Sequence, residues 1–190
     1  MKGGLVNRHE FVATRSESLL LVIDFQGAML KVIADWEAAA HSVGQLVRAA
    51  ESLAVPILLT EQYKKGLGPT VPEVLRNISS PRVFHKEHFS ACLEPEFLPF
   101  LNTFNRGKIV VVGMETHVCV LQTCLDLIHA GFQVHLVSDA VASRNPANRA
   151  VAIEMLRDAG AVVTSAEIVI FEWACRANTD AFRSILPIVR

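Results

Sequence analysis

The chain has 190 residues, of which 51% are hydrophobic and 19% charged, and its formal net charge is −1 at pH 7. This length suits one domain with an ordinary hydrophobic core, and the composition argues against a disordered chain. The near-neutral charge provides no basic field for nucleic acid, and no apolar run approaches the ~20 residues that a membrane helix requires. We therefore expect residues 1–190 to form a single domain that binds neither nucleic acid nor membrane.

The N-terminal stretch 1–17 is polar and lacks the apolar segment of a signal peptide, so a cytoplasmic location is the default prediction. Thiols stay reduced in that compartment. The four cysteines form no CxxC pair and have no histidine at zinc-finger spacing, which favours free thiols over a metal knuckle. They are Cys92, Cys119, Cys124 and Cys175.

Short apolar runs rich in valine, isoleucine and leucine are typical of buried parallel strands. Such runs occur at 19–23, 55–60, 82–85, 108–113, 133–138 and, less cleanly, 161–170. Helical patterns alternate with them at 36–53, 117–130, 145–159 and 178–186. This alternation predicts an α/β fold, a three-layer αβα arrangement around a doubly wound, mostly parallel six-stranded sheet of the Rossmann-like type.

The segment 61–80 breaks this rhythm because it contains several glycines and prolines. We expect it to be a loop with at most a short helix. It follows a predicted strand, and loops at strand ends are where binding residues concentrate.

Three chemically active side chains stand where predicted strands end. Asp24 follows the first run, Lys86 the third, and Cys119 lies just beyond the fourth. In an open parallel sheet, ligands bind at the carboxyl ends of the strands. A thiol beside a carboxylate and an ammonium group is suited to nucleophilic catalysis at a carbonyl, so these residues are candidates for one catalytic site.

Cys119 falls in the first turn of a predicted helix. Unpaired N–H groups and the helix dipole at such a position stabilise a thiolate, so we expect a lowered pKa for this thiol. The same N–H groups are suited to hold an oxyanion. The alternative interpretation is a small buried hydrophobic residue, which is the usual role of a lone cysteine.

The other candidates also have simpler interpretations. Asp24 would cap a helix beginning near Gly27, and Lys86 would be a surface lysine. His85 and His88 point to opposite faces of an extended segment, so we do not expect both to bind one metal. His117 is either the base of a Cys/His pair or, as we prefer, a residue that lines the pocket, because Asp24 already supplies a base.

Together these motifs resemble the isochorismatase-like cysteine hydrolase superfamily, which includes isochorismatases, nicotinamidases and N-carbamoylsarcosine amidases. The resemblance rests on Asp24-x-Gln26, on Lys86, and on Gly113-Met-Glu-Thr-His-Val-Cys119-Val120. It extends from about residue 18 to residue 170 and includes the segment Asp139-Ala-Val-Ala-Ser143-Arg144. The segment Thr60-Glu61-Gln62-Tyr63-x-Lys65-Gly66-Leu67-Gly68 is most similar to isochorismatase domain-containing proteins.

The resemblance implies a mechanism. Asp24 takes the proton of the Cys119 thiol, the thiolate attacks a carbonyl carbon, and Lys86 favours both ionised forms. Asp24 then returns the proton to the leaving amine and activates the hydrolytic water. The family also has a non-proline cis peptide, here between Met114 and Glu115. The N–H groups of Glu115 and Cys119 would then form the oxyanion hole.

Departures from the family bear on the substrate. The metal-binding Asp-x-His…His set of nicotinamidases is absent from 61–65, so no metal and no cofactor are expected. Cys119 is retained, which favours a small neutral amide or related acyl substrate over the vinyl ether of true isochorismatases. The substrate-binding candidates are Phe25, Gln26, Tyr63, Phe89, Glu115 and His117.

Two further interpretations stay open. One is ether hydrolysis of the isochorismatase type, and the other is a catalytically silent member that acts as an oligomeric binding protein. Family members commonly assemble, so the resemblance also implies a homo-oligomer, a dimer or larger. The sequence does not name the substrate.

Overall fold

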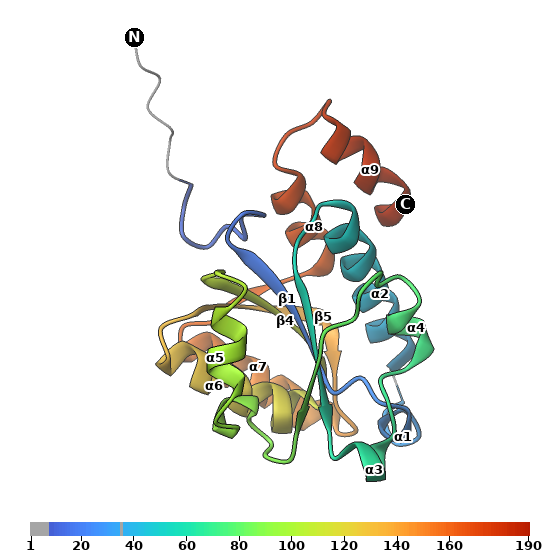
Figure 1. Cartoon of the computed structure of the whole chain (residues 1–190), viewed down its shortest axis with the longest axis vertical. Helices are drawn as coiled ribbons and strands as arrows, with labels where there is room; N and C mark the ends of the chain where they lie inside the picture. Colours follow the sequence, from blue (N-terminus) through green and yellow to red (C-terminus); the bar gives the residue numbers. More distant parts are fainter. Residues whose placement is uncertain (1–7, 35) are drawn as a thin grey trace.

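The computed structural model describes residues 8–34 and 36–190 (Figure 1). Its centre is a six-stranded sheet in which every strand pairing is parallel and the strand order is β3-β2-β1-β4-β5-β6. This confirms the predicted fold class. The strands are β1 (Ser18–Ile23), β2 (Ile57–Gln62), β3 (Val83–Lys86), β4 (Lys108–Met114), β5 (Gln133–Ala142) and β6 (Val162–Thr164).

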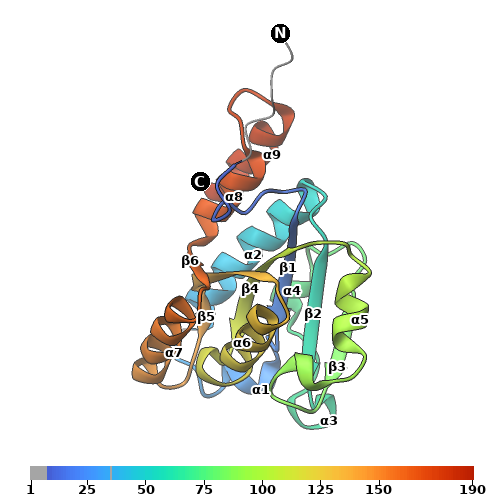
Figure 2. The same ribbon diagram turned by 90° about the vertical axis from the view of Figure 1, so that its left-hand side faces the viewer.

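Helices cover both faces of the sheet (Figures 1 and 2). One face carries α2 (Trp36–Ser52), α4 (Pro72–Leu75), α8 (Ala166–Ala174) and α9 (Asp180–Val189). The other carries α5 (Phe97–Asn102), α6 (Leu121–His129) and α7 (Pro146–Asp158). The short elements are α1 (Gly27–Leu30), α3 (Lys64–Leu67), the 3-10 turn η1 (Ala91–Leu93) and the π-helical turn η2 (Thr116–Val120).

The first strand shows why a continuous apolar run is required at the centre of this sheet. All six residues of β1 are buried, and alternate side chains enter opposite hydrophobic layers. Leu20 and Val22 pack on the side of α2, whereas Leu21 and Ile23 pack on the side of α6. A strand covered on both faces needs apolar residues at both parities.

The strand order reverses at β1, which lies between β2 and β4. The chain connects β1 to β2 over one face and later returns to β4 on the opposite edge of β1. In doubly wound folds, the crevice at such a switch point, beyond the carboxyl ends of the strands, is the usual ligand-binding position. Here that crevice is bounded by the residues that follow β1 and β4.

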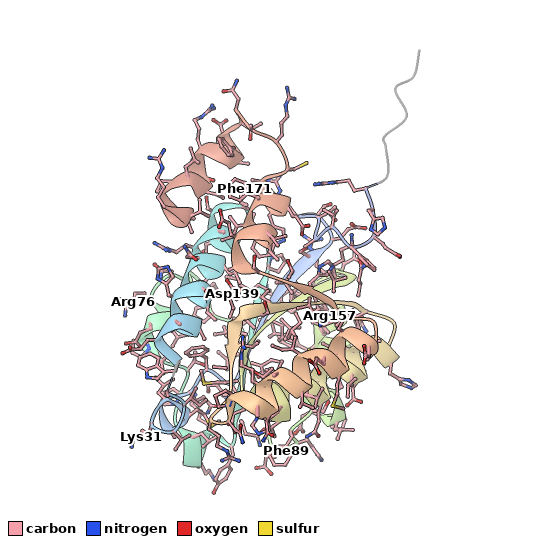
Figure 3. All side chains as sticks on the ribbon, turned by 180° about the vertical axis from the view of Figure 1, so that it is seen from behind. Lys31, Arg76, Phe89, Asp139, Arg157 and Phe171 are labelled. Atoms are coloured by element: carbon pink, nitrogen blue, oxygen red, sulfur yellow. The ribbon has the colours of Figure 1, made fainter. Side chains whose placement is uncertain are left out.

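The last predicted strand was too long. Strand β6 ends at Thr164, and the remainder of the apolar run forms α8. The amide of Ala166 donates a 2.9 Å hydrogen bond to Asp139 Oδ1, and the Ser165 hydroxyl accepts one from the amide of Ile168. These bonds satisfy amides that open a helix. Figure 3 shows Asp139 at this junction, beside α2 and α8.

The segment 61–80 also differs from the prediction of a loop with at most one short helix. Strand β2 continues to Gln62, and two single helical turns, α3 and α4, follow it. Pro72 stands at the first position of α4, where its missing N–H costs nothing. The segment remains close to the end of β2, because Thr70 donates from both its amide and its hydroxyl to Glu61 Oε1.

Candidate active site

Asp24 is the first residue after β1 and is almost completely buried. Its φ angle is +47°, a conformation in which aspartate is several times more common than most residues. The carboxylate Oδ1 accepts a 2.7 Å hydrogen bond from the Thr60 hydroxyl. The helix-cap alternative is wrong, because α1 has Gln26 at its N-cap position and no side chain caps it.

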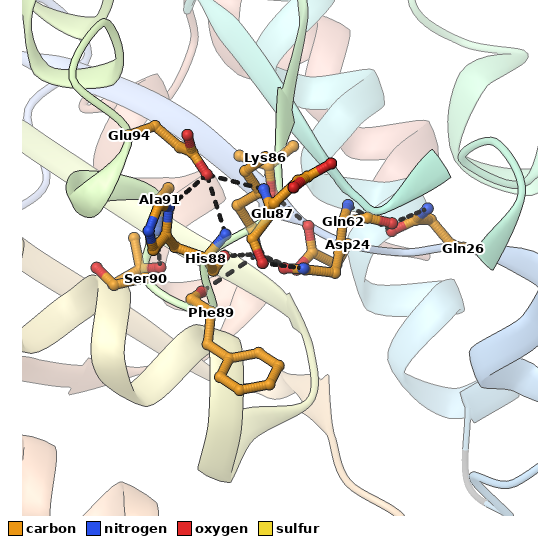
Figure 4. A network of polar contacts seen from close by, with 12 residues as sticks. Asp24, Gln26, Gln62, Lys86, Glu87, His88, Phe89, Ser90, Ala91 and Glu94 are labelled. Atoms are coloured by element: carbon orange, nitrogen blue, oxygen red, sulfur yellow. Dashed lines mark hydrogen bonds and ion pairs between the residues drawn. The ribbon is translucent and has the colours of Figure 1, made fainter. Parts of the chain in front are cut away.

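Lys86 is the last residue of β3, and its side chain has no exposed surface. The ammonium Nζ lies 2.7 Å from Asp24 Oδ2. It donates hydrogen bonds to Gln62 Oε1 at 2.6 Å and to the carbonyl oxygens of His88 and Phe89, both at 3.2 Å (Figure 4). The surface-lysine alternative is therefore wrong, since Lys86 is a buried cation paired with a buried anion.

Cys119 lies in η2, directly after β4, and is 7% exposed. Burial raises the pKa of its thiol to about 12, and the charge of Asp24 acts in the same direction. The charge of Lys86 opposes this shift. The charges of both residues therefore act on the thiol, which places Asp24 and Lys86 near it.

The expected lowering of this pKa was wrong. The prediction considered only the effect of the helix terminus on the thiol pKa. In the folded site, desolvation and the neighbouring carboxylate of Asp24 have the larger effect and raise that pKa. In the resting protein the thiol keeps its proton at neutral pH. A nucleophilic role therefore requires a base that takes this proton as the substrate reacts.

The end of β4 approaches β1 very closely. Gly113 has a φ of +124°, and a Cβ atom at this position would overlap the carbonyl oxygen of Ile23. Only glycine fits this close approach, which brings the segment after β4 beside Asp24. One residue further along, the Met114–Glu115 peptide bond is cis.

The residues around η2 link it to the segment after β5. The buried carboxylate of Glu115 accepts a 3.0 Å hydrogen bond from the amide of Arg144, and the Arg144 guanidinium lies 3.6 Å away. His117 Nδ1 is 3.0 Å from the Ser143 hydroxyl. The side chains of Glu115 and His117 thus hold the two strand ends together at the crevice.

The remaining substrate-binding candidates occupy different environments. Phe25 has no exposed surface and packs in the core beside α2, which is a packing position and not the wall of an open pocket. The Gln26 amide is buried and bonds to the backbone of Gln62 and to the carbonyl of Gly68. Tyr63 directly follows β2, Phe89 lies shortly after β3, and each side chain is 55% exposed.

Glu61 and the histidines near it form pairs and not a metal centre. Burial raises the pKa of Glu61, but hydrogen bonds from Thr70 and Lys64 outweigh it and leave that pKa lowered. His85 is 3.4 Å from Glu61, whereas His88 is 2.8 Å from Glu94. Within residues 8–34 and 36–190, no group of three or more His, Cys, Asp or Glu side chains could hold a metal ion.

Two residues that contact the candidate triad directly were missed from the sequence. Thr60 and Gln62 lie at the end of β2, where the strand register places them opposite Ile23 and Lys86 respectively. The available signal was their position, because both are polar residues at the carboxyl end of a strand. In the sequence this segment stood out only for its family resemblance.

No helix in the described part of the chain is long and apolar enough to cross a membrane. Comparison with protein-family models matches residues 18–168 to the isochorismatase domain. The chain belongs to the isochorismatase family. A curated isochorismatase-family relative, the secreted isochorismatase effector Isc1 of Phytophthora sojae, is 40% identical over 178 residues, which cover 91% of this chain and 84% of the relative.

Two solved structures show the same fold as this isochorismatase-family chain. The protein described as the MAR1 ribonuclease of Caenorhabditis elegans superposes with a TM-score of 0.87 at 33% identity, covering 93% of this chain and 91% of its own. The YcaC gene product of Escherichia coli, described as an octameric hydrolase of unknown specificity, gives a TM-score of 0.86 at 22% identity, covering 95% and 94%. The second likeness shows the fold alone.

Proposed function

We propose that this isochorismatase-family protein is a hydrolase that uses Cys119 as a nucleophile on a small amide or related acyl substrate. One observation carries the proposal: a buried thiol, a buried carboxylate and a buried ammonium group interact at the switch point of the sheet. Burying two charges beside a thiol costs free energy, so such an arrangement points to a function. Groups with perturbed pKa values also cluster at functional sites.

The proposed reaction begins with proton transfer. Asp24 takes the proton of the Cys119 thiol through Oδ2, because Oδ1 already accepts from Thr60. The sulfur attacks the carbonyl carbon, and the resulting oxyanion is held by the backbone N–H groups of Glu115 and Cys119. The C–N bond then breaks, the amine leaves with the proton from Asp24, and a thioester remains on Cys119.

Water completes the cycle. Asp24 takes a proton from a water molecule that attacks the thioester carbonyl, and the sulfur leaves and recovers that proton. The charge of Lys86 compensates the negative charge, which resides first on Asp24 and then on the sulfur. Because Asp24 removes the proton as the substrate reacts and Lys86 compensates the charge, a thiol with a pKa of about 12 is compatible with catalysis.

The proposed substrate is small and neutral. The nominated contacts, Phe25, Gln26, Tyr63, Phe89 and His117, are mainly aromatic or amide side chains. The core position of Phe25 makes Tyr63, Phe89 and His117 the stronger choices for direct contact. The proposal includes no cofactor and no metal.

An activity screen tests the proposal. Purified protein is incubated with panels of small amides, esters, vinyl ethers and RNA, and the covalent state of Cys119 is followed by mass spectrometry. We expect amide or ester turnover with a transient acyl mass on Cys119, and loss of both in Cys119→Ala. Turnover of vinyl ethers in Cys119→Ala would instead support ether hydrolysis, and RNA cleavage by the wild-type protein would support the activity for which its nematode relative is named.

Assembly is part of the proposal. We propose a homo-oligomer, a dimer or larger, and the octameric description of the YcaC structure supports this. Light scattering at micromolar concentration measures the mass directly. A catalytically silent oligomer would assemble normally but show no acyl mass on Cys119 with any member of the panel.

A further inference from the structure

The hydrogen bonds of Lys86 are distributed in an unusual way. An ammonium group has three N–H donors. In this site all three have neutral acceptors: the side-chain oxygen of Gln62 and the carbonyl oxygens of His88 and Phe89 (Figure 4). Asp24 Oδ2 is only 2.7 Å from Nζ, yet it accepts no hydrogen bond of proper geometry from any residue in the described ranges.

This distribution separates two effects that Lys86 exerts on Asp24. The charge of Lys86 acts on the carboxylate at short range, whereas the contact between Nζ and Oδ2 falls outside hydrogen-bond geometry. The other oxygen, Oδ1, is occupied by the Thr60 hydroxyl. One lone-pair region of the carboxylate, on Oδ2, therefore stays open. The same carboxylate acts by its charge on the Cys119 thiol, whose proton it must accept.

Gln62 is the only side chain among the three neutral acceptors, so it is the one that mutation can remove. Its amide is held in one orientation, because Nε2 donates a 2.6 Å hydrogen bond to the carbonyl of Glu87. The oxygen must then face the ammonium group. The backbone of Gln62 is held as well, since its N–H donates to Gln26 Oε1 at 2.8 Å and its carbonyl accepts from Gln26 Nε2 at 3.0 Å.

We propose that Gln62 is a positioning residue of the hydrolytic site. Its amide oxygen takes the Lys86 N–H that would otherwise bond to Asp24, and this keeps Oδ2 free for the proton of Cys119. A neutral acceptor is required, because a carboxylate at this position would compete with Asp24 for the ammonium charge. It would also lose the donor that now bonds to Glu87. The inference rests on the proposed function of the triad.

The test compares two reactions of the same sulfur. p-Nitrophenyl acetate acylates Cys119 with release of nitrophenolate, a reaction in which Asp24 removes the thiol proton. Iodoacetamide alkylates whatever thiolate is present and needs no base in the site. The ratio of the acylation rate to the alkylation rate therefore reports the proton-accepting role of Asp24 separately from access to the thiol.

In Gln62→Met the side-chain volume is nearly kept but the acceptor is lost. We expect the acylation-to-alkylation ratio to fall about fivefold, the factor that corresponds to one ordinary hydrogen bond. Gln62→Glu should lower the ratio at least as much. Gln122→Met, the same exchange at an exposed position of α6, should leave it unchanged. If Gln62 only supported the fold, loosening the site would change both rates together.

Parallel variants separate the failure of this inference from the failure of the function. If Asp24→Asn abolishes acylation while Gln62→Met stays within twofold of the wild-type ratio, Gln62 has no positioning role and the proposed function stands. If Asp24→Asn and Cys119→Ala both keep the acylation burst, the proposed function itself is wrong. Should Gln62→Met lack a cooperative unfolding transition, Gln62→Asn, which keeps the amide but shortens its reach, must lower the ratio in its place.

Discussion

Thr60 and Asp24 stand at the ends of adjacent strands, and the Thr60 hydroxyl donates a 2.7 Å hydrogen bond to Asp24 Oδ1. Both residues are buried, so the carboxylate has no water to replace this donor if it is removed. The Thr60–Asp24 bond fixes the orientation of the carboxylate. It thereby determines that Oδ2, and not Oδ1, lies next to Lys86.

The first prediction concerns this bond. Thr60→Val preserves shape but leaves Asp24 Oδ1 without its donor, and we expect a loss of about 1–3 kcal/mol in the free energy of unfolding. Urea denaturation measures it. Thr103→Val is the control, because that hydroxyl lies at an exposed helix end and donates to the carbonyl of Phe100. Equal losses in the two variants would contradict the importance assigned to the Thr60–Asp24 bond.

The second prediction concerns the contact between β4 and β1. Gly113→Ala places a methyl group against the Ile23 carbonyl in a backbone conformation that disfavours side chains. We expect destabilisation on the order of 3 kcal/mol or more. Gly107→Ala is the matched control, since no heavy atom lies within 4 Å of the added Cβ. A Gly113→Ala protein as stable as the Gly107→Ala protein would show that the strands can separate without cost.

The third prediction is a pH dependence of stability. His135 in β5 is fully buried, and desolvation lowers its pKa from 6.5 to about 4, with a further contribution from the charge of Lys108. Because the unfolded chain binds a proton at higher pH than the folded chain does, stability falls as pH drops from 6.5 to about 4. The expected loss is on the order of 3 kcal/mol.

Replacement of that imidazole tests the assignment. In His135→Leu the part of the pH dependence between 6.5 and about 4 that belongs to this residue should disappear. Chemical denaturation at several pH values in this range measures the slope for both proteins. Identical slopes would mean that other groups cause the acid sensitivity.

The fourth prediction concerns the order in which the cysteines react. Cys119 should not be the first cysteine to react with iodoacetamide, because its pKa is about 12 and it is buried. The exposed Cys175 should react first, and Cys124, which is fully buried with a raised pKa, last. Peptide mass spectrometry after timed labelling gives the order.

Charge variants extend this prediction in opposite directions. Asp24→Asn removes a charge that raises the Cys119 pKa, so alkylation of Cys119 should become faster. Lys86→Met removes a charge that lowers it, so alkylation should become slower. At a pH well below the pKa of a thiol, a decrease of one in that pKa raises the thiolate fraction, and with it the alkylation rate, about tenfold. Rate changes in the same direction in both variants would contradict the proposed arrangement.

The fifth prediction concerns metals. The residues at 61–65 include no histidine, and the described ranges contain no cluster of metal-binding side chains. We expect hydrolysis of the best substrate to be unchanged after dialysis against a chelator. Activity that disappears on chelation and returns with added zinc would overturn the metal-free mechanism.

Much of the fold could be predicted because a sheet buried on both faces imposes a strong pattern. Strands covered by helices must be apolar throughout, so their ends are visible as the first polar residues. This is why Asp24 could be located at a strand end from the apolar run before it. The signal for Lys86 was weaker, because β3 is an edge strand and His85 within it is exposed. The run at 161–170 was wrongly predicted to be one strand, because a short apolar stretch does not distinguish a strand from a buried helix.

The candidate site was predictable only in part. Their positions at strand ends, and then the family resemblance, grouped Asp24, Lys86 and Cys119. Their mutual interaction required the strand order β3-β2-β1-β4, which sets three distant segments side by side. The pKa of Cys119 was predicted with the wrong sign, because it depends on burial and on a carboxylate 95 positions away in the chain, neither of which local sequence contains.

The sequence by itself determined the class of fold and the identity of the chemical groups, since hydrophobic pattern and residue type are local properties. The tertiary structure alone decided which oxygen of Asp24 is open and which acceptors hold the ammonium group of Lys86. Hydrogen-bond geometry depends on distances of a few tenths of an ångström between residues far apart in the chain. Such distances arise only when the strands are aligned and packed.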